Sequence, residues 1–217
     1  MKPAAIIFDF DGVIVDSEVP ANLALAECLT EIGLETCFEE ALDRYCGQRW
    51  ADCVRDIEER LGHALPQDLE PIYLTRAASL MDRHLTAVCG IDAFLDRTKH
   101  LPLAIASSSE PEWIAHKLER VSLCHYFGDR LFSAAQLEHG KPYPDVYLHA
   151  AKGLGIAPER CLAIEDSAIG ATAAVAAGMH VIGLCAASHI RNREAHAEML
   201  RAVGVHRIAF GFDEIVL

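Results

Sequence analysis

The sequence predicts an α/β fold: a Rossmann-like, doubly wound parallel sheet with a small all-helical domain inserted after the first strand. Three observations lead to this class. The chain opens with a continuous apolar run, residues 4–8, which is typical of a strand buried on both faces. Residues 17–84 then show helical periodicity without a convincing strand. From residue 90 onward, short apolar runs alternate with helical stretches, as expected for parallel strands joined by right-handed crossovers.

The expected elements follow in order, and glycine or proline marks several of their boundaries. In the inserted region, helices are expected at residues 19–29, 39–45, 50–61 and 69–85. In the alternating region, strands are expected at residues 101–106, 131–133, 161–164 and 180–184, with an edge strand at 208–209. Further helices are expected at 90–99, after Pro111, from Pro144 to Leu154 and at 168–177. The expected domains are therefore a core of residues 1–16 and 85–217 and a helical cap of residues 17–84.

Charge and cysteine content limit the partners and the compartment. The chain has 217 residues and a formal net charge of −13, so it should repel nucleic acid and anionic membranes. No apolar run is long enough to span a bilayer, and Asp9 and Asp11 interrupt the first apolar stretch too early for a signal peptide. The eight cysteines are scattered without a Cys-x-x-Cys pair, which favours reduced thiols. We expect a cytoplasmic monomer that binds neither nucleic acid nor membrane.

The stretch Phe8-Asp9-Phe10-Asp11-Gly12 places two carboxylates directly after the first predicted strand. Asp9 and Asp11 are two residues apart, so they face the same side of an extended chain, and Gly12 permits a sharp turn. Ligands bind at this end of the strands in open α/β sheets. Neighbouring carboxylates favour a hard cation such as Mg²⁺, and the pair allows one nucleophile and one proton carrier. An acidic turn without any such function is the structural alternative.

Other predicted strands also end in polar residues, which parallel pairing would bring to the same edge. Ser107 and Ser108 precede a predicted helix, whose N-terminal amides can hold phosphate oxygens. Glu165 and Asp166 follow another strand, where they would lie opposite Asp9 and complete a Mg²⁺ site. The structural alternatives are a helix-capping serine and an acidic first helical turn.

Four motifs, taken in order, resemble those of the haloacid dehalogenase superfamily. They are Asp9-x-Asp11-Gly12, Ala106-Ser107-Ser108, a lysine (Lys141) followed by Pro-x-Pro-Asp, and Glu165-Asp166-Ser167 with Gly170. The Asp16-Ser17-Glu18 segment and the helical insert resemble the members with a small helical cap. The resemblance covers nearly the whole chain. It implies a Mg²⁺-dependent phosphomonoester hydrolase that works through an aspartyl-phosphate on a small phosphorylated metabolite.

The resemblance also implies a role for each motif residue. Asp9 is the nucleophile, and Asp11 protonates the leaving alkoxide and then activates water. Mg²⁺ is held by the side chains of Asp9, Glu165 and Asp166 and by Asp11 through its backbone carbonyl. The transferring phosphoryl group is bound by Ser107, Ser108 and Lys141.

The sequence leaves the substrate open between two groups of this superfamily. Segments around residues 16–19, 125–127 and 187–189 resemble phosphatases of the 6-phosphogluconate type, which favours a sugar phosphate or sugar-acid phosphate such as 6-phosphogluconate. Isomerisation of the β-phosphoglucomutase type is the alternative, although Ala21, Cys46 and Trp50 stand where the mutases carry other residues. In the cap, Gln48 and Arg49 are the candidate substrate contacts, with Arg49 pairing with a carboxylate.

A different class also has an acidic cluster, a Ser or Thr and a lysine on a parallel sheet, namely the phospho-accepting receiver module. Such a module would be about half as long as this chain and would have no helical insert after the first strand. An inactive member of the superfamily is a third alternative, but every motif residue is present.

Overall fold

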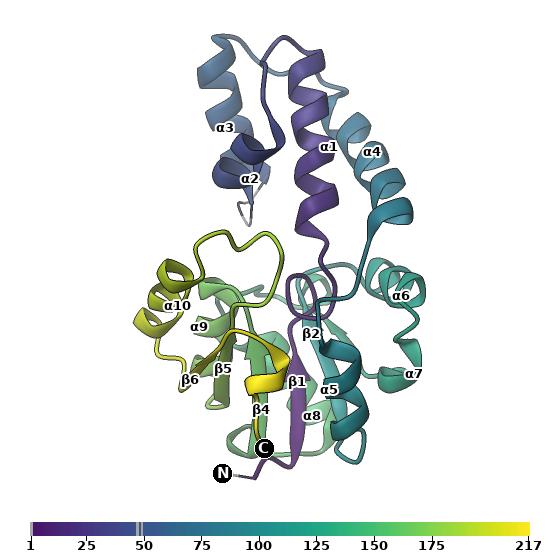
Figure 1. Ribbon diagram of the computed structural model, residues 1–217, viewed down its shortest axis with the longest axis vertical. Coiled ribbons are helices and arrows are strands. Elements are labelled where there is room, and N and C mark those ends of the chain that lie inside the picture. The colour runs from purple at the N-terminus through teal and green to yellow at the C-terminus, as the bar shows by residue number, and fades with distance from the viewer. Residues whose placement is uncertain (1, 47, 49) are drawn as a thin grey trace. The chain divides into compact units, whose positions relative to one another are not determined.

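The computed structural model describes residues 2–46, 48 and 50–217, and the chain forms two compact units. The larger unit comprises Met1–Asp16 and Thr86–Leu217, and the smaller unit comprises Ser17–Leu85. Figure 1 follows the chain through both units. Among the described residues, no helix combines the length and the apolar character that a membrane span requires.

The larger unit is built around a parallel sheet that has six strands within the described residues, in the order β3-β2-β1-β4-β5-β6. Figure 1 labels every strand of this sheet except β3. The strands are β1 (Ala5–Phe8), β2 (Leu103–Ser107), β3 (Leu131–Ser133), β4 (Cys161–Glu165), β5 (His180–Leu184) and β6 (Arg207–Ala209). Strand β1 lies in the middle, and Phe8 is in register with Ile105 of β2 and Ile164 of β4. The chain order reverses direction at β1, so the ends of β1, β2 and β4 lie side by side.

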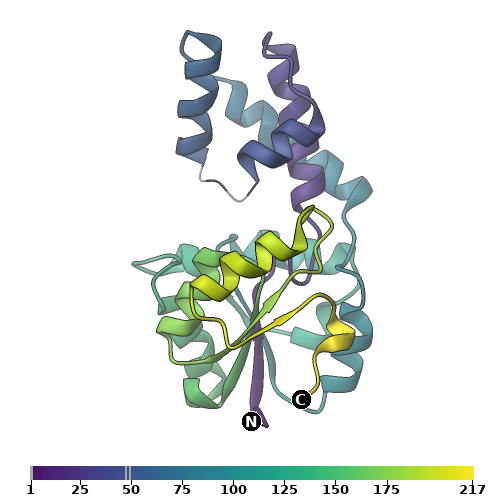
Figure 2. The ribbon, with the colours of Figure 1, turned by 60° about the vertical axis from the view of Figure 1, so that its left-hand side comes forward.

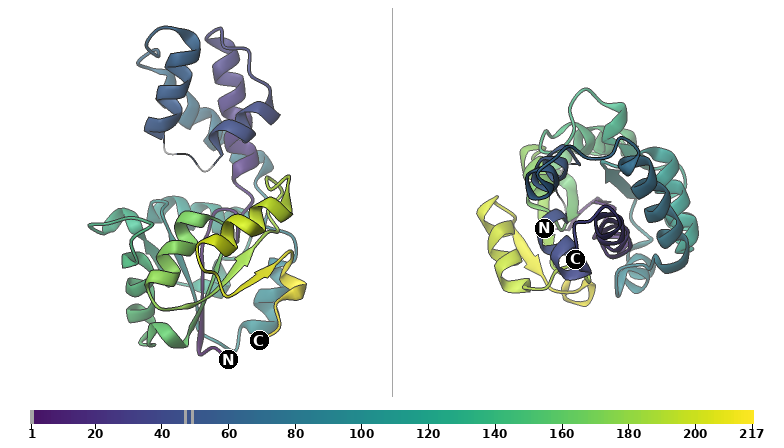
Figure 3. Two further views of the ribbon diagram at one scale, coloured as in Figure 1. Left: turned by 90° about the vertical axis from the view of Figure 1, so that its left-hand side faces the viewer. Right: turned by 90° about the horizontal axis from the view of Figure 1, so that it is seen from above.

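Helices cover both faces of this sheet (Figures 2 and 3). They are α5 (Ile91–Thr98), α6 (Pro111–Arg120), α7 (Cys124–Phe127), α8 (Asp145–Leu154), α9 (Ala168–Ala176) and α10 (Arg193–Ala202). Ile7 belongs to the apolar core formed with α8, α9 and α10. Phe8 points to the opposite face, where its ring meets those of Phe94 and Phe127 edge-on at 6.0 and 5.9 Å. Alternate residues of β1 thus serve two layers, which confirms the predicted Rossmann-like fold class.

The smaller unit consists, in the part that the structure describes, of four helices: α1 (Glu18–Glu31), α2 (Phe38–Tyr45), α3 (Trp50–Leu61) and α4 (Leu69–His84). It has its own apolar core, in which Leu29 and Ile57 are fully buried and the Trp50 ring stacks on Tyr73 at 5.2 Å. The Tyr45 hydroxyl donates a hydrogen bond to Asp56 at 2.8 Å. Apolar residues at helical spacing, such as Trp50 and Ile57, explain why the helices of this unit pack together.

The sequence did not indicate two helices of the larger unit, α7 and α10. Helix α7 has only four residues. Helix α10 is mostly polar and buries only Ala197 and Leu200, so its apolar periodicity is weak. A capping signal was nevertheless present, because the Asn192 side chain accepts a hydrogen bond from the Ala195 amide at 3.1 Å.

Candidate active site

The loop after β1 turns sharply at Gly12, which lies beside a carboxylate from the neighbouring strand. The Asp9 amide still bonds to the Ile164 carbonyl at 2.9 Å, so Asp9 continues the sheet. Gly12 has a φ of +83°, and its amide bonds to the Val15 carbonyl at 2.8 Å. A Cβ atom on Gly12 would lie 1.9 Å from Oδ2 of Asp166. Only glycine therefore suits both the backbone conformation and the close approach of this carboxylate.

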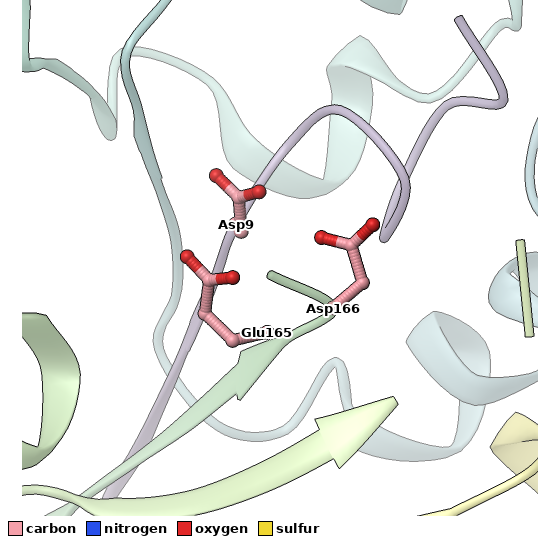
Figure 4. A group of neighbouring side chains, drawn as sticks. All are labelled: Asp9, Glu165 and Asp166. Atoms are coloured by element: carbon pink, nitrogen blue, oxygen red, sulfur yellow. The ribbon is translucent and has the colours of Figure 1, made fainter. Parts of the chain in front are cut away.

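Three buried carboxylates meet at the ends of β1 and β4. Figure 4 shows Asp9 at the end of one strand and Glu165 and Asp166 at the end of the other, with their oxygens directed toward a common region. One oxygen from each of the three lies within 4.8 Å of those of the other two. The sequence analysis predicted that the polar residues at the ends of these strands lie close together. The structure brings Asp9, Glu165 and Asp166 together in this way.

Hydrogen bonds fix Glu165 on all sides, and its side chain is completely buried. Its Oε1 accepts hydrogen bonds from Nζ of Lys141 at 2.7 Å and from the Tyr147 hydroxyl at 2.8 Å. Its Oε2 accepts from the amide and the hydroxyl of Ser167, each at 3.0 Å. Gly170 provides the space, because a Cβ atom there would lie 1.6 Å from Oε1.

Lys141 joins the acidic cluster from the loop before α8. Its Nζ lies 2.6 Å from Oδ1 of Asp9 and 2.7 Å from Oε1 of Glu165, and only 6% of its side chain is exposed. The ammonium group also lies over the Tyr147 ring, 5.1 Å from its centroid. Burial of an ammonium is unfavourable unless it is paired, so these two carboxylates explain why a lysine occupies this position.

Three groups in this cluster, Asp9, Lys141 and Tyr147, have raised pKa values, so their protonated forms are favoured. Burial, followed by repulsion from Glu165, raises the pKa of Asp9 from 3.8 to about 7, even though Lys141 acts in the opposite direction. Burial opposes the charge on Lys141, but Asp9 and Glu165 prevail and raise its pKa. Burial and Glu165 raise the pKa of Tyr147 well above its ordinary value. One ammonium therefore does not balance these carboxylates, and the cluster holds protons tightly.

A metal ion fits this arrangement. The donors of Asp9, Glu165 and Asp166 are all carboxylate oxygens, the set that hard divalent cations prefer. A cation would supply the positive charge that Lys141 alone does not. The space beside Gly12 admits the Asp166 carboxylate, which a larger residue would displace. These three residues could therefore hold a divalent metal ion.

The carboxylate of Asp11 has different partners from that of Asp9. Its Oδ1 lies 2.5 Å from Nζ of Lys117, and its Oδ2 accepts a hydrogen bond from the Ser109 hydroxyl at 2.8 Å. Lys117 comes from α6, and its side chain is only 9% exposed. Sequence reasoning missed Lys117, because nothing in the motif spacing distinguishes it from a lysine on the solvent side of a helix.

The two candidate phosphate-binding serines differ in exposure. Ser107 is the last residue of β2 and is buried, and its hydroxyl oxygen accepts a hydrogen bond from the Ser109 amide at 3.0 Å. Ser108 is exposed. Glu110, not a serine, occupies the N-cap position of α6. The alternative of a helix-capping serine therefore does not describe Ser107.

Two histidines that the sequence analysis did not name as site residues approach Asp166 from the segment after β5. The His196 ring contacts the Asp166 backbone carbonyl at 2.5 Å. Nε2 of His189 lies 3.8 Å from Oδ2 of Asp166. Burial lowers the pKa of His189, which favours its neutral form.

The two cap candidates belong to the smaller unit. Gln48 is exposed, and its amide bonds to the Tyr45 carbonyl at 3.1 Å. Arg49 lies outside the residues that the structure describes.

A doubly wound parallel sheet with a carboxylate cluster and a buried lysine at its carboxyl edge defines an α/β enzyme with an acidic, metal-compatible active site. Residues 6–184 match the family model for haloacid dehalogenase-like hydrolases, and the chain belongs to this family. The family, fold-class and enzyme-class predictions are thereby confirmed.

Individual relatives support the same placement. The chain is 32% identical over 186 residues to 6-phosphogluconate phosphatase of Escherichia coli (strain K12), covering 85% of this chain and 84% of that protein. It is 30% identical over 184 residues to a fructose-1-phosphate phosphatase of the same organism, covering 82% and 95%. A crystal structure of a haloacid dehalogenase family hydrolase from Deinococcus radiodurans, with bound phosphate and sodium, is 32% identical with a TM-score of 0.83, covering 98% and 93%.

Proposed function

We propose that the chain is a Mg²⁺-dependent phosphomonoester hydrolase that acts on a small phosphorylated metabolite through an aspartyl-phosphate intermediate. The observation that carries this proposal is the environment of Asp9. Its buried carboxylate stands at the middle strand's end, 2.6 Å from Lys141 and close to two further acidic residues. Such a group needs a cation before it can act as a carboxylate nucleophile. The phosphatase names of the two relatives support the same reaction class.

In the first step, a carboxylate oxygen of Asp9 attacks phosphorus and forms a P–O bond. The bond from phosphorus to the substrate oxygen breaks, its electron pair stays on that oxygen, and the oxygen takes a proton from Asp11. Lys141, which bonds to Asp9, offsets the charge of the phosphoryl group as it approaches. Ser107 and Ser108 bind phosphoryl oxygens from the end of the neighbouring strand.

In the second step, a water molecule gives a proton to the Asp11 carboxylate while its oxygen attacks phosphorus. The P–O bond to Asp9 breaks, the Asp9 carboxylate is restored and inorganic phosphate leaves. Asp11 therefore acts first as an acid and then as a base, and it ends the cycle with its proton.

Asp9, Glu165, Asp166 and the backbone carbonyl of Asp11 would hold Mg²⁺, which when bound offsets the charge on the phosphoryl oxygens. The hydrogen bonds within the cluster indicate that its carboxylates contribute differently to metal binding. Glu165 already accepts four hydrogen bonds, two of them from Ser167, so its principal contribution is to hold Lys141. Asp9 and Asp166 would be the more direct ligands.

The proposed substrate is a sugar phosphate or a sugar-acid phosphate such as 6-phosphogluconate. Two relatives with similarity over most of the chain support this class, since their names specify a phosphorylated sugar acid and a phosphorylated sugar. The smaller unit, Ser17–Leu85, would then recognise the leaving group as a cap, with Gln48 and Arg49 as candidate contacts. We also propose that the enzyme is a monomer and is located in the cytoplasm.

The test is Mg²⁺-dependent release of inorganic phosphate from a panel of sugar phosphates and phospho-acids, with Asp9→Asn as the control. We expect release that requires Mg²⁺, disappears in Asp9→Asn and is fastest for one class of leaving group. Isomerisation of β-glucose 1-phosphate in the presence of a bisphosphate primer, without phosphate release, would instead indicate a mutase. Release that persists in Asp9→Asn would contradict the assignment of the nucleophile.

A further inference from the structure

Lys117 is a buried charged residue that none of the four motifs includes and the proposed reaction does not use. It lies on α6, its side chain is 9% exposed, and its Nζ lies 2.5 Å from Oδ1 of Asp11. The ammonium group is also 5.7 Å from the centre of the Phe10 ring. Burial of an ammonium is costly, and packing alone does not require it here. Ile114 and Leu118 of the same helix are already fully or almost fully buried and anchor α6.

The two oxygens of the Asp11 carboxylate are held from two different elements. Lys117 binds Oδ1 from α6, and the Ser109 hydroxyl donates to Oδ2 from the loop after β2. Ser109 is fixed in turn: its amide donates to the Ser107 hydroxyl oxygen at 3.0 Å, and its carbonyl accepts from the Ser133 hydroxyl at 2.7 Å. A carboxylate held at both oxygens by anchored donors has little freedom to rotate.

We propose that Lys117 is a positioning residue that, together with Ser109, fixes the carboxyl group of Asp11 for proton transfer to the leaving group. This inference rests on the proposed function, in which Asp11 is the proton donor. Proton transfer requires a donor within hydrogen-bond reach of the leaving oxygen, and a displacement of about 1 Å can reduce a rate about 100-fold. Lys117 does not touch the substrate in this proposal, so its influence should appear only where Asp11 is needed.

The choice of leaving group distinguishes a reaction that needs the proton of Asp11 from one that does not. A p-nitrophenolate leaves readily without a proton, whereas the alkoxide of a sugar phosphate does not. The parameter kcat/KM covers steps only up to departure of the leaving group, so later hydrolysis of the intermediate does not mask the effect. At saturating Mg²⁺, we expect Lys117→Met to lower kcat/KM for the preferred sugar phosphate by about tenfold or more. For p-nitrophenyl phosphate, the same change should stay within about twofold.

Three further variants complete the test. Lys117→Arg keeps the charge and the donors, so it should recover part of the loss. Lys152→Met removes an exposed lysine from α8 and should change neither substrate. In an Asp11→Asn background, Lys117→Met should cause no further loss on the sugar phosphate, because the group through which it acts is already absent.

The outcomes distinguish this inference from the proposed function. If the wild type releases no phosphate, or if Asp9→Asn remains active, the proposed function fails. The positioning role would be overturned if Lys117→Met lowered kcat/KM equally for both substrates or left both values unchanged. Full additivity with Asp11→Asn would overturn it as well. None of these results would contradict the proposed phosphatase activity. Urea unfolding of the single and double variants gives a readout without activity: Lys117→Met and Asp11→Asn should be coupled, and independent effects would overturn the contact itself.

Discussion

Gly170→Ala should destabilise the protein even though helix propensity predicts the opposite. Gly170 lies inside α9, where alanine is normally favoured over glycine by about 1 kcal/mol. A Cβ atom at this position would lie 1.6 Å from Oε1 and 2.2 Å from Cδ of Glu165, so the Glu165 carboxyl group must move. It has no solvent to move into, because Glu165 is completely buried.

The size of the effect follows from the hydrogen bonds that Glu165 would lose. Those from Lys141 and Tyr147 both end on the oxygen that overlaps the new methyl group. At about 1.5–3 kcal/mol for each bond to a charged group, their loss costs about 3–6 kcal/mol. Subtracting the gain in propensity leaves a net loss of about 2–5 kcal/mol, or about 4–20 °C in melting temperature.

The assay is urea and thermal unfolding of Gly170→Ala beside Gly140→Ala. A Cβ atom at Gly140 would meet no atom within 4 Å, so this control should unfold like the wild type. Phosphate release by Gly170→Ala should fall as well, because Lys141 loses one of its two carboxylate partners. A Gly170→Ala protein as stable as the wild type would show that the cluster around Glu165 is not the rigid arrangement described here.

Two further predictions concern the proposed metal site and the smaller unit. The pKa of Asp9 is about 7 in the folded protein against 3.8 as its ordinary value, so its contribution to metal-free stability is full below about pH 4 and is lost as the pH rises to about 7. Mg²⁺ needs the ionised carboxylate, so the rise in melting temperature from EDTA to Mg²⁺ should be larger at about pH 8 than at about pH 5.5; an equal rise would contradict the cluster. In the smaller unit, Tyr45→Phe removes hydrogen bonds to Asp56 and from Arg60 and should cost about 1–2 kcal/mol in urea unfolding. Tyr126→Phe, which removes an exposed bond to Asp96, should cost less than about 0.5 kcal/mol, and equal costs would contradict this reasoning.

The fold was predictable because its strands carry a strong local signal. The first strand, Ala5–Phe8, is apolar at every position since both of its faces are covered, and glycines or prolines separate many elements. Helix α10 lacked such a signal, because only Ala197 and Leu200 face the core. Its beginning depends instead on the Asn192 cap, which a search for capping residues would have found.

The acidic cluster was predictable for a similar reason: Glu165 ends an apolar strand, Asp9 and Asp166 directly follow one, and parallel strands bring their ends together. The partners of Asp11 were not predictable in this way. Lys117 reaches Asp11 from the second turn of α6, and its position depends on how that helix packs. Tertiary packing of this kind leaves no motif in the sequence.

The contrast between Asp9 and Asp11 supports a division of roles between two carboxylates that lie only two residues apart. Asp9 is buried among acidic groups, and it shares Lys141 with Glu165. Asp11 is 26% exposed at its side chain and has a separate lysine, Lys117. The turn at Gly12 carries the chain away from the sheet immediately after Asp11, so only Asp9 remains in register with β4. Different environments of this kind are how neighbouring carboxylates acquire different roles, one as nucleophile and the other as proton carrier.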